Sequence, residues 1–173
     1  MIQKRKFIIP IAILLLVLIS MPVLASPVCS GSETSVNEYS ELLSPGIKQS
    51  QGTESSVARG DMFASADITI TDKGNGDIGA LAIAYTREPV DEAYITVFLD
   101  RWNEEQDRWI NVDYYDAEFY AEDYPDGLTT PTVSITFLNQ ERGYYYRLRS
   151  SFSVVKGDIY EGFSPKTAGI LIE

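Results

Sequence analysis

The longest alternating run outside the N-terminus reads Gly143-Tyr144-Tyr145-Tyr146-Arg147-Leu148-Arg149-Ser150-Ser151-Phe152. In an extended chain, one face of this run carries Tyr144, Tyr146, Leu148 and Phe152, and the other carries Tyr145, Arg147, Arg149 and Ser151. Large apolar residues that alternate with Arg predict a strand with one face on a core and one face in water. That pattern is typical of an antiparallel sheet.

The segment before this strand points to a particular kind of sheet protein. Leu138 precedes Tyr144 by six residues, across the polar link 139–143. This spacing is similar to the tyrosine corner of Ig-like and fibronectin type III sandwiches, where a Tyr near the start of strand F bonds back to the preceding link. We therefore expect the Tyr144 hydroxyl to make such a bond, and Leu148 to lie in the core.

Other alternating or apolar segments, separated by turn signals, also predict strands. We expect them at 62–71, 78–85, 94–102, 108–114, 132–138 and 159–172, the last broken at 162–165. The segment 115–130 has no clean period and is predicted to be a long loop. Together with 144–155 these make seven strands, which predicts an all-β, seven-stranded antiparallel β-sandwich, Ig/fibronectin III-like, over residues 59–173.

The N-terminus has the pattern of a secretory signal peptide. Basic residues at 4–6 precede an apolar run at 7–19, and small residues precede a cleavage position after Ala25. The run is shorter than the about 20 apolar residues that a membrane span needs, although an uncleaved signal anchor is the alternative. We predict a signal peptide at 1–25 and a secreted, extracellular protein.

The charge balance disfavours two classes of partner. The formal net charge is −11, and removal of residues 1–25 takes away three basic residues and no acidic one, which leaves −14. So acidic a chain is repelled by phosphate backbones and by anionic membrane surfaces. We expect no nucleic-acid partner and no membrane association of the mature form.

The segment 26–58 has the composition of a disordered tail or linker. Ser, Glu, Gly, Thr and Gln dominate it, and few apolar residues are available to offset the entropy of ordering. The one cysteine, Cys29, lies here, so no intrachain disulfide forms. Lipid attachment is disfavoured because Val28, rather than a small residue, precedes Cys29.

The residue types exclude several kinds of catalytic and metal site. The chain has no His, and one Cys cannot build a zinc or iron–sulfur site. We predict no enzyme activity and no cofactor; a carboxylate-dependent hydrolase remains an alternative. Two clusters of acidic residues could supply oxygen ligands for Ca²⁺, but for both we favour the interpretation that the acids are solvated surface residues. The first group is Asp72, Asn75 and Asp77, and the second is Asp113, Asp116, Glu118, Glu122, Asp123 and Asp126.

Aromatic residues interleave with the acids of the second group. Sugars stack on exposed aromatic rings, and protein interfaces favour Tyr and Trp, although rings that fill the core would give the same composition. The candidate ligand-binding residues are Tyr114, Tyr115, Asp116, Glu118, Tyr120, Tyr124 and Asp126. We expect a noncatalytic extracellular interaction module with an unknown protein or glycan partner; the alternative is a carbohydrate- or Ca²⁺-binding module that uses 114–126.

Several short segments together resemble one family. They are Arg59-Gly60, Ile68 and Ile70 before Gly74-Asn75-Gly76, Val90-Asp91 before Ile95, Val97 and Leu99, then Trp109, 144–149, Glu161, Thr167 and Gly169-Ile170. They look like an uncharacterised family of small secreted proteins of Gram-positive bacteria, known as a domain of unknown function. The resemblance covers about residues 59–173 and implies export and this fold, without an activity.

Overall fold

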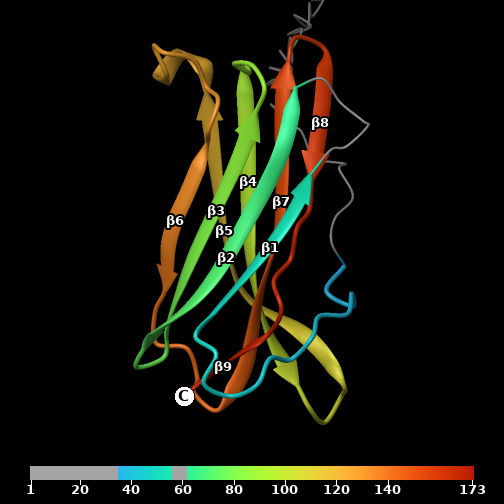
Figure 1. Cartoon of the computed structure of the whole chain (residues 1–173), viewed down its shortest axis with the longest axis vertical. Coiled ribbons are helices and arrows are strands. Elements are labelled where there is room, and N and C mark those ends of the chain that lie inside the picture. Colours follow the sequence, from blue (N-terminus) through green and yellow to red (C-terminus); the bar gives the residue numbers. More distant parts are fainter. Residues whose placement is uncertain (1–34, 56–61) are drawn as a thin grey trace, which may run out of the picture.

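The computed structural model describes residues 35–55 and 62–173, which form two antiparallel sheets (Figure 1). The predicted signal peptide, Cys29 and residues 59–61 lie outside the described residues. One sheet has the order β1-β2-β3-β6, and the other has β5-β4-β7-β8, with β9 also paired to β7. The strands are β1 Gln49–Ser55, β2 Phe63–Gly74, β3 Asp77–Thr86, β4 Glu92–Asn103, β5 Arg108–Tyr120, β6 Thr132–Phe137, β7 Tyr144–Lys156, β8 Ile159–Phe163 and β9 Ile170–Ile172.

The all-β class is confirmed, but the described residues form nine strands rather than seven. One difference is that the predicted final strand is two strands, β8 and β9, which pair with opposite ends of β7. Between them, Lys166 makes an isolated bridge to Arg149 of β7. The break predicted within this strand is therefore real, because the chain from 159 to 172 follows a single edge of β7.

The other extra strand, β1, lies inside the segment predicted to be disordered. That prediction is wrong for residues 35–55, since β1 pairs with β2 from Gln49–Thr71 to Ser55–Ser65. An edge strand receives much of its stabilisation from backbone pairing, so a polar composition does not exclude it. Gly52 lets β1 approach the next layer closely, because an added Cβ would lie 2.0 Å from the Lys166 carbonyl oxygen.

Strand β5 continues beyond the predicted boundary. It runs to Tyr120 and is followed by a short 3-10 helix, Ala121–Asp123. The prediction of a loop from 115 is therefore wrong for 115–120. Ala117 and Phe119 pack against the core and alternate there with Asp116 and Glu118, but this apolar row is short and only partly buried, so its signal in the sequence is weak.

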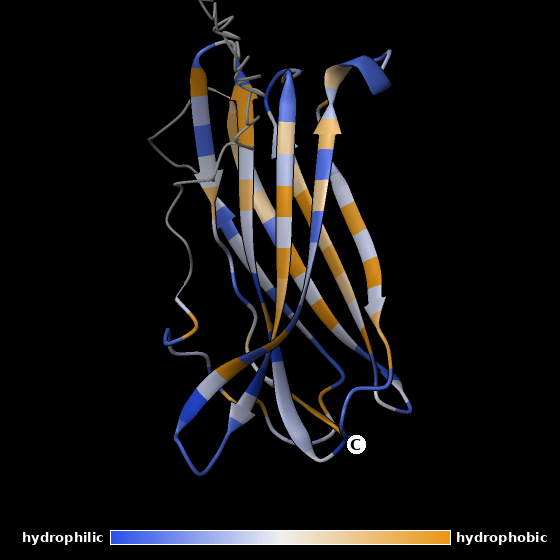
Figure 2. Ribbon diagram, turned by 180° about the vertical axis from the view of Figure 1, so that it is seen from behind, coloured by the Kyte–Doolittle hydropathy of each residue, from blue (hydrophilic) through white to orange (hydrophobic). Residues whose placement is uncertain are grey.

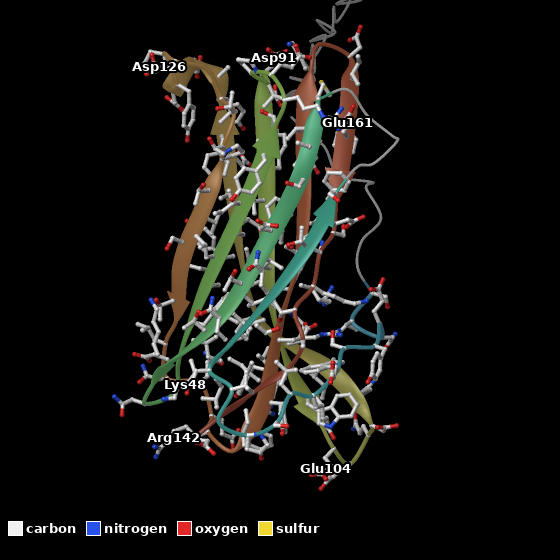
Figure 3. All side chains as sticks on the ribbon, in the orientation of Figure 1. Lys48, Asp91, Glu104, Asp126, Arg142 and Glu161 are labelled. Atoms are coloured by element: carbon white, nitrogen blue, oxygen red, sulfur yellow. The ribbon has the colours of Figure 1, made fainter. Side chains whose placement is uncertain are left out.

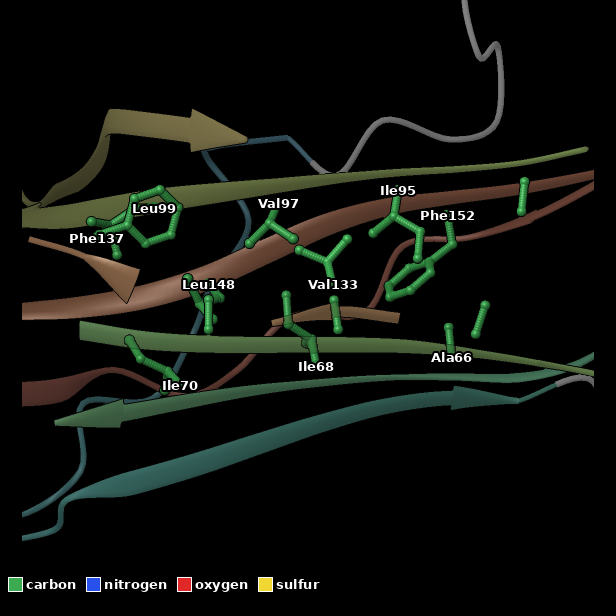
Figure 4. Packing of buried hydrophobic residues seen from close by; sticks show 14 of the residues in the cluster. Ala66, Ile68, Ile70, Ile95, Val97, Leu99, Val133, Phe137, Leu148 and Phe152 are labelled. Atoms are coloured by element: carbon green, nitrogen blue, oxygen red, sulfur yellow. The ribbon is translucent and has the colours of Figure 1, made fainter. Parts of the chain in front are cut away.

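The core lies between the two sheets, where apolar rows from β2 and β4 face one another (Figure 4). The alternation of apolar and polar residues along the strands is visible in Figure 2. The central rows consist of Ala66, Ile68 and Ile70 on β2 and Ile95, Val97 and Leu99 on β4, all of them almost completely buried. These rows belong to one continuous cluster of buried apolar side chains that fills the space between the sheets.

Strand β7 has both faces covered, contrary to the prediction of one face in water. Leu148 and Phe152 point into the core as expected, but Arg147 is fully buried and Arg149 is 6% exposed on the opposite face. The prediction that Tyr144 bonds back to the preceding link is also wrong, because the residue that makes this bond lies two positions later on the same face of the strand. The hydroxyl of Tyr146, not Tyr144, donates to the Glu141 carbonyl oxygen at 2.8 Å, and Tyr144 is 40% exposed.

Candidate functional site

The predicted ligand-binding residues separate into a row on β5 and a loop beyond it. Tyr114, Asp116, Glu118 and Tyr120 alternate along β5 and pair with Phe98, Thr96, Tyr94 and Glu92 of β4. They therefore share the outer face of the sheet, which is the face directed away from the sandwich core. We call these four residues the β5 row; Tyr115, one residue out of phase, lies on the other side.

Aromatic rings and carboxylates contact one another at the end of the β5 row. The Tyr120 hydroxyl donates to Glu118 at 2.6 Å, and the Tyr94 hydroxyl donates to Glu92. The rings of Tyr94 and Tyr120 meet edge to face at 6.3 Å. Burial and then the hydrogen bond to Glu92 raise the pKa of Tyr94 above its ordinary value of 10.0. Both phenols therefore stay protonated at neutral pH and act as hydrogen-bond donors.

The two remaining predicted residues lie away from the row. Tyr124 follows the 3-10 helix and packs against Phe119, with ring centroids 6.4 Å apart. Asp126 lies at the tip of this connection, at one end of the molecule (Figure 3). The sequence thus identified an aromatic and acidic region correctly, but the structure does not bring all seven residues into one site.

The acidic groups do not gather around a cation position. Among residues 35–55 and 62–173, no three Asp, Glu, His or Cys side chains are placed to hold a metal ion together. In the β2–β3 turn, Asp72 accepts a hydrogen bond from the Gly74 amide at 2.8 Å, and Asp77 accepts one from the Asn139 amide at 3.0 Å. These two carboxylates therefore hold backbone turns in place.

A pocket that the sequence did not predict lies beside the β4–β5 hairpin. It has a volume of about 630 Å³. One wall belongs to the N-terminal arm, which we define as residues 35–48, and the other to the hairpin, where Trp102 and Trp109 meet at 5.3 Å. The lining residues are Asn37, Glu38, Tyr39, Ser40, Glu41, Leu42, Trp102, Asp107, Arg108 and Trp109.

Arg147 holds the arm against the outer face of β7. Its guanidinium donates to the carbonyl oxygens of Glu38 at 2.6 Å and Val36 at 2.9 Å, and to the Ser40 hydroxyl at 2.9 Å. The backbone of the arm also pairs with Gly169, which donates to the Glu41 carbonyl oxygen and accepts from the Leu43 amide. Most of these contacts involve backbone atoms, so the polar composition of the arm does not weaken them.

A buried charge cluster lies beneath the arm. Asp100 Oδ2 is 3.0 Å from Arg147 Nε and 2.5 Å from Arg149 Nε. The Arg147 guanidinium also lies 4.5 Å from the centre of the Trp109 ring. Burial lowers the pKa of Arg147 from its ordinary value, and Asp100 opposes this shift. Arg147 and Arg149 share the single carboxylate of Asp100, and the carbonyl oxygens of the arm act as further acceptors for Arg147.

Sequence reasoning missed the pocket because it treated the arm as disordered. A signal was nevertheless present: the two tryptophans of the chain flank the predicted hairpin loop 103–107, and the register Trp102–Trp109 places them opposite each other. Cross-strand aromatic pairs of this kind are neighbours on one face of a sheet. The missing information was the covering segment, which lies more than fifty positions earlier in the chain.

Comparisons with protein-family models and with curated proteins give no match. In the part of the chain that the structure describes, no helix is both long enough and apolar enough to cross a membrane.

Proposed function

We propose that this chain is a secreted, noncatalytic extracellular interaction module that binds a protein or glycan partner through the β5 row. The observation that carries this proposal is the alignment of two tyrosines and two carboxylates on the outer face of a 13-residue edge strand. Aromatic rings provide much of the affinity at interfaces, and an edge strand also offers backbone hydrogen-bonding groups. The absence of His from the sequence favours binding over nucleophilic catalysis.

The proposal includes an Ig/fibronectin III-like type of sandwich. When β1 is set aside, the order β2-β3-β6 against β5-β4-β7-β8 corresponds to strands A-B-E and C′-C-F-G. Tyr146 then lies near the start of strand F and bonds to Glu141 in the preceding link, as a tyrosine corner does. In this type of fold, sheet faces and end loops commonly carry the binding surface, which agrees with a site on β5.

Secretion and membership of a small Gram-positive secreted family also remain proposals. Their support is the basic and apolar pattern of 1–25, the acidic balance of the rest of the chain and the short segments quoted above. A direct check is N-terminal sequencing of protein recovered from the culture medium of the producing cell. A chain that begins at Ser26 would agree with the proposal, and a cell-retained chain that begins at Met1 would contradict it.

The binding proposal is tested with a variant that lacks the rings of the row. The labelled protein is applied to protein and polysaccharide fractions of the producing cell's envelope, and the retained amount is measured. Tyr114→Ser with Tyr120→Ser should lower retention at least about fivefold. The matched control, Leu138→Ser with Ile159→Ser, removes two apolar side chains that are 60% and 59% exposed elsewhere. Equal retention of the two double variants would contradict the proposal.

A carbohydrate- or Ca²⁺-binding module is the second candidate, because hydroxyl and carboxylate oxygens alternate with rings along the row. A ligand that binds only the folded chain raises the melting temperature by mass action. Thermal melts with millimolar Ca²⁺ and with a panel of soluble glycans therefore distinguish a Ca²⁺ or glycan ligand from a protein partner. A rise with either ligand favours this candidate, and no rise leaves a protein partner.

A further inference from the structure

Trp102 lines two hollows at the tip of the β4–β5 hairpin. One is the pocket walled by the N-terminal arm, of about 630 Å³. The other is a hollow of about 340 Å³, which reaches Tyr144. Its lining residues are Arg101, Trp102, Asn103, Glu104, Glu105 and Tyr144. One tryptophan residue therefore lines both hollows.

The charges around the first hollow have mainly one sign. Glu41 and Asp107 are exposed acids in its lining, and Arg108 is the cation among the described residues that line it. Glu38 also lines it, but an ion pair with Lys166 already neutralises that carboxylate. Among its exposed lining residues the hollow thus has two acids and one base, while the buried guanidinium of Arg147 lies behind it, 4.5 Å from the Trp109 ring.

The second hollow repeats this arrangement. Glu104 and Glu105 are exposed acids in its lining. Its one cation, Arg101, is 2.5 Å from Glu141 and lies over the Tyr144 ring at 4.7 Å. A second hollow with acidic and aromatic lining residues therefore shares Trp102 with the first.

We propose that these two hollows bind a basic extended peptide segment, with one Lys or Arg side chain seated in each hollow. The inference rests on the proposed interaction function and names the class of partner: a protein segment rich in cationic side chains. Carboxylates attract the cation over a distance, and an indole face adds a cation–π contact. A neutral saccharide would gain nothing from the charge, and the phosphates of nucleic acids would be repelled.

The N-terminal arm is needed to complete this site. It contributes Glu41 and the Tyr39 ring, which is 82% exposed, and Arg147 fixes its backbone in position. The first hollow is larger than a single ammonium group requires. Both hollows are open to solvent, so two side chains of one continuous peptide can enter them. The geometry therefore favours a peptide over a small free cation.

The test uses the two tryptophans as built-in reporters, because the sequence contains no others. The probe is acetyl-tetralysine amide, titrated into the full protein at low ionic strength while tryptophan emission is followed. Saturable change is expected, and it should weaken as salt is added, because exposed charges are screened. Acetyl-tetraglutamate amide should give no change. Absence of saturable change with tetralysine would overturn the inference.

Matched variants separate a local site from the general acidity of the protein. Glu41→Gln with Asp107→Asn removes two charges from the first hollow and should raise the dissociation constant about tenfold. The control pair, Glu88→Gln with Asp158→Asn, removes two charges near the β7–β8 turn, where Glu88 pairs with Lys156. Asp91 accepts a hydrogen bond from the Gly157 amide of this turn. Asp91 and Glu104 lie at opposite ends of the molecule (Figure 3). The control pair should change the dissociation constant less than twofold. Equal effects of the two pairs would overturn the inference.

A ring variant completes the test and separates this inference from the proposed function. Trp102→Leu should weaken tetralysine binding at least about fivefold, measured by calorimetry, with the far-ultraviolet spectrum as a check of folding. If tetralysine fails to bind while envelope fractions still retain the protein through the β5 row, only the peptide inference falls. If the envelope fractions fail and tetralysine binds, the β5 row is not the partner site.

Discussion

Arg147 Nε lies 3.0 Å from Asp100 Oδ2, and both side chains are fully buried. This pair connects the outer face of the second sheet to the N-terminal arm, because the same guanidinium donates to backbone carbonyls of the arm. Ionic groups out of contact with water are destabilising unless each finds partners. Among the described residues, every buried side-chain nitrogen and oxygen has a hydrogen-bond partner, and this includes the atoms of the Asp100 cluster.

Asp100→Asn should lower the free energy of unfolding by about 3–5 kcal/mol, because two buried guanidinium groups would lose their shared anion. Urea denaturation measures the change. Glu141→Gln is the control, because it breaks an exposed ion pair. The side chains of Arg101 and Glu141 are 31% and 61% exposed, so this change should lower the free energy of unfolding by about 1 kcal/mol or less. If both variants lost the same small amount, the cluster would not contribute as the geometry indicates.

Tyr146→Phe should lower the free energy of unfolding by about 1 kcal/mol or more, because it leaves the Glu141 carbonyl oxygen without its hydroxyl donor. Tyr144→Phe should have little effect, since Tyr144 is 40% exposed. Chemical denaturation of the two variants in parallel decides between the residues. A larger loss for Tyr144→Phe would restore the original prediction from sequence spacing.

Leu148→Ala should cost about 2–5 kcal/mol, as is usual for a buried Leu that leaves a cavity. Leu138→Ala makes the same chemical change at a side chain that is 60% exposed, and it should cost less than about 1 kcal/mol. The midpoint of urea unfolding gives both values. Similar losses would show that the inner face of β7 has been assigned to the wrong residues.

Gly52→Ala should displace β1 from its place in the structure, because the new methyl group would meet the Lys166 carbonyl oxygen at 2.0 Å. Backbone atoms cannot move aside cheaply, so we expect a lower melting temperature and faster proteolysis within 35–55. Gln51→Ala, at an exposed neighbouring position, is the matched control. Wild-type resistance to protease in Gly52→Ala would contradict this packing of β1.

Stability should decline above pH 10 in part through Tyr94. Its folded-state pKa is raised, first by burial and then by Glu92, above the value of about 10 that it takes in the unfolded chain. The folded chain therefore holds the proton more tightly, so this contribution is complete below pH 10 and is lost as the pH rises toward the folded-state pKa. Denaturation at several pH values should show a shallower decline for Tyr94→Phe; identical slopes would exclude this origin.

The predicted fold depended on local patterns, and those patterns were strong where one face of a strand was apolar. Ile68 and Ile70 on one strand, and Ile95 and Val97 on another, alternate with polar residues and lie in the core as expected. The same reasoning failed at Arg147, because alternation says which residues share a face but not what covers that face. A charged residue was therefore assigned to water although a distant segment buries it.

The candidate site was predictable only in part, for a related reason. Tyr114, Asp116, Glu118 and Tyr120 were identified from composition, yet their alignment depends on β5 continuing to Tyr120 as an edge strand. That continuation is marked only by a short apolar row, because Ala117 and Phe119 alone pack against the core in this part of β5. The pocket at Trp102 could not be predicted, since more than half of its lining residues belong to the arm.

By itself, the sequence determined an all-β chain with strands at most of the observed positions and an acidic, aromatic surface. Those properties follow from side-chain periodicity and charge, which are local. Only the tertiary structure decided that the arm is ordered, that Asp100 joins Arg147 and Arg149, and that Tyr146 makes the corner bond. These features depend on contacts between segments far apart in the chain, whose energies come from backbone hydrogen bonds and buried charge that no local pattern records.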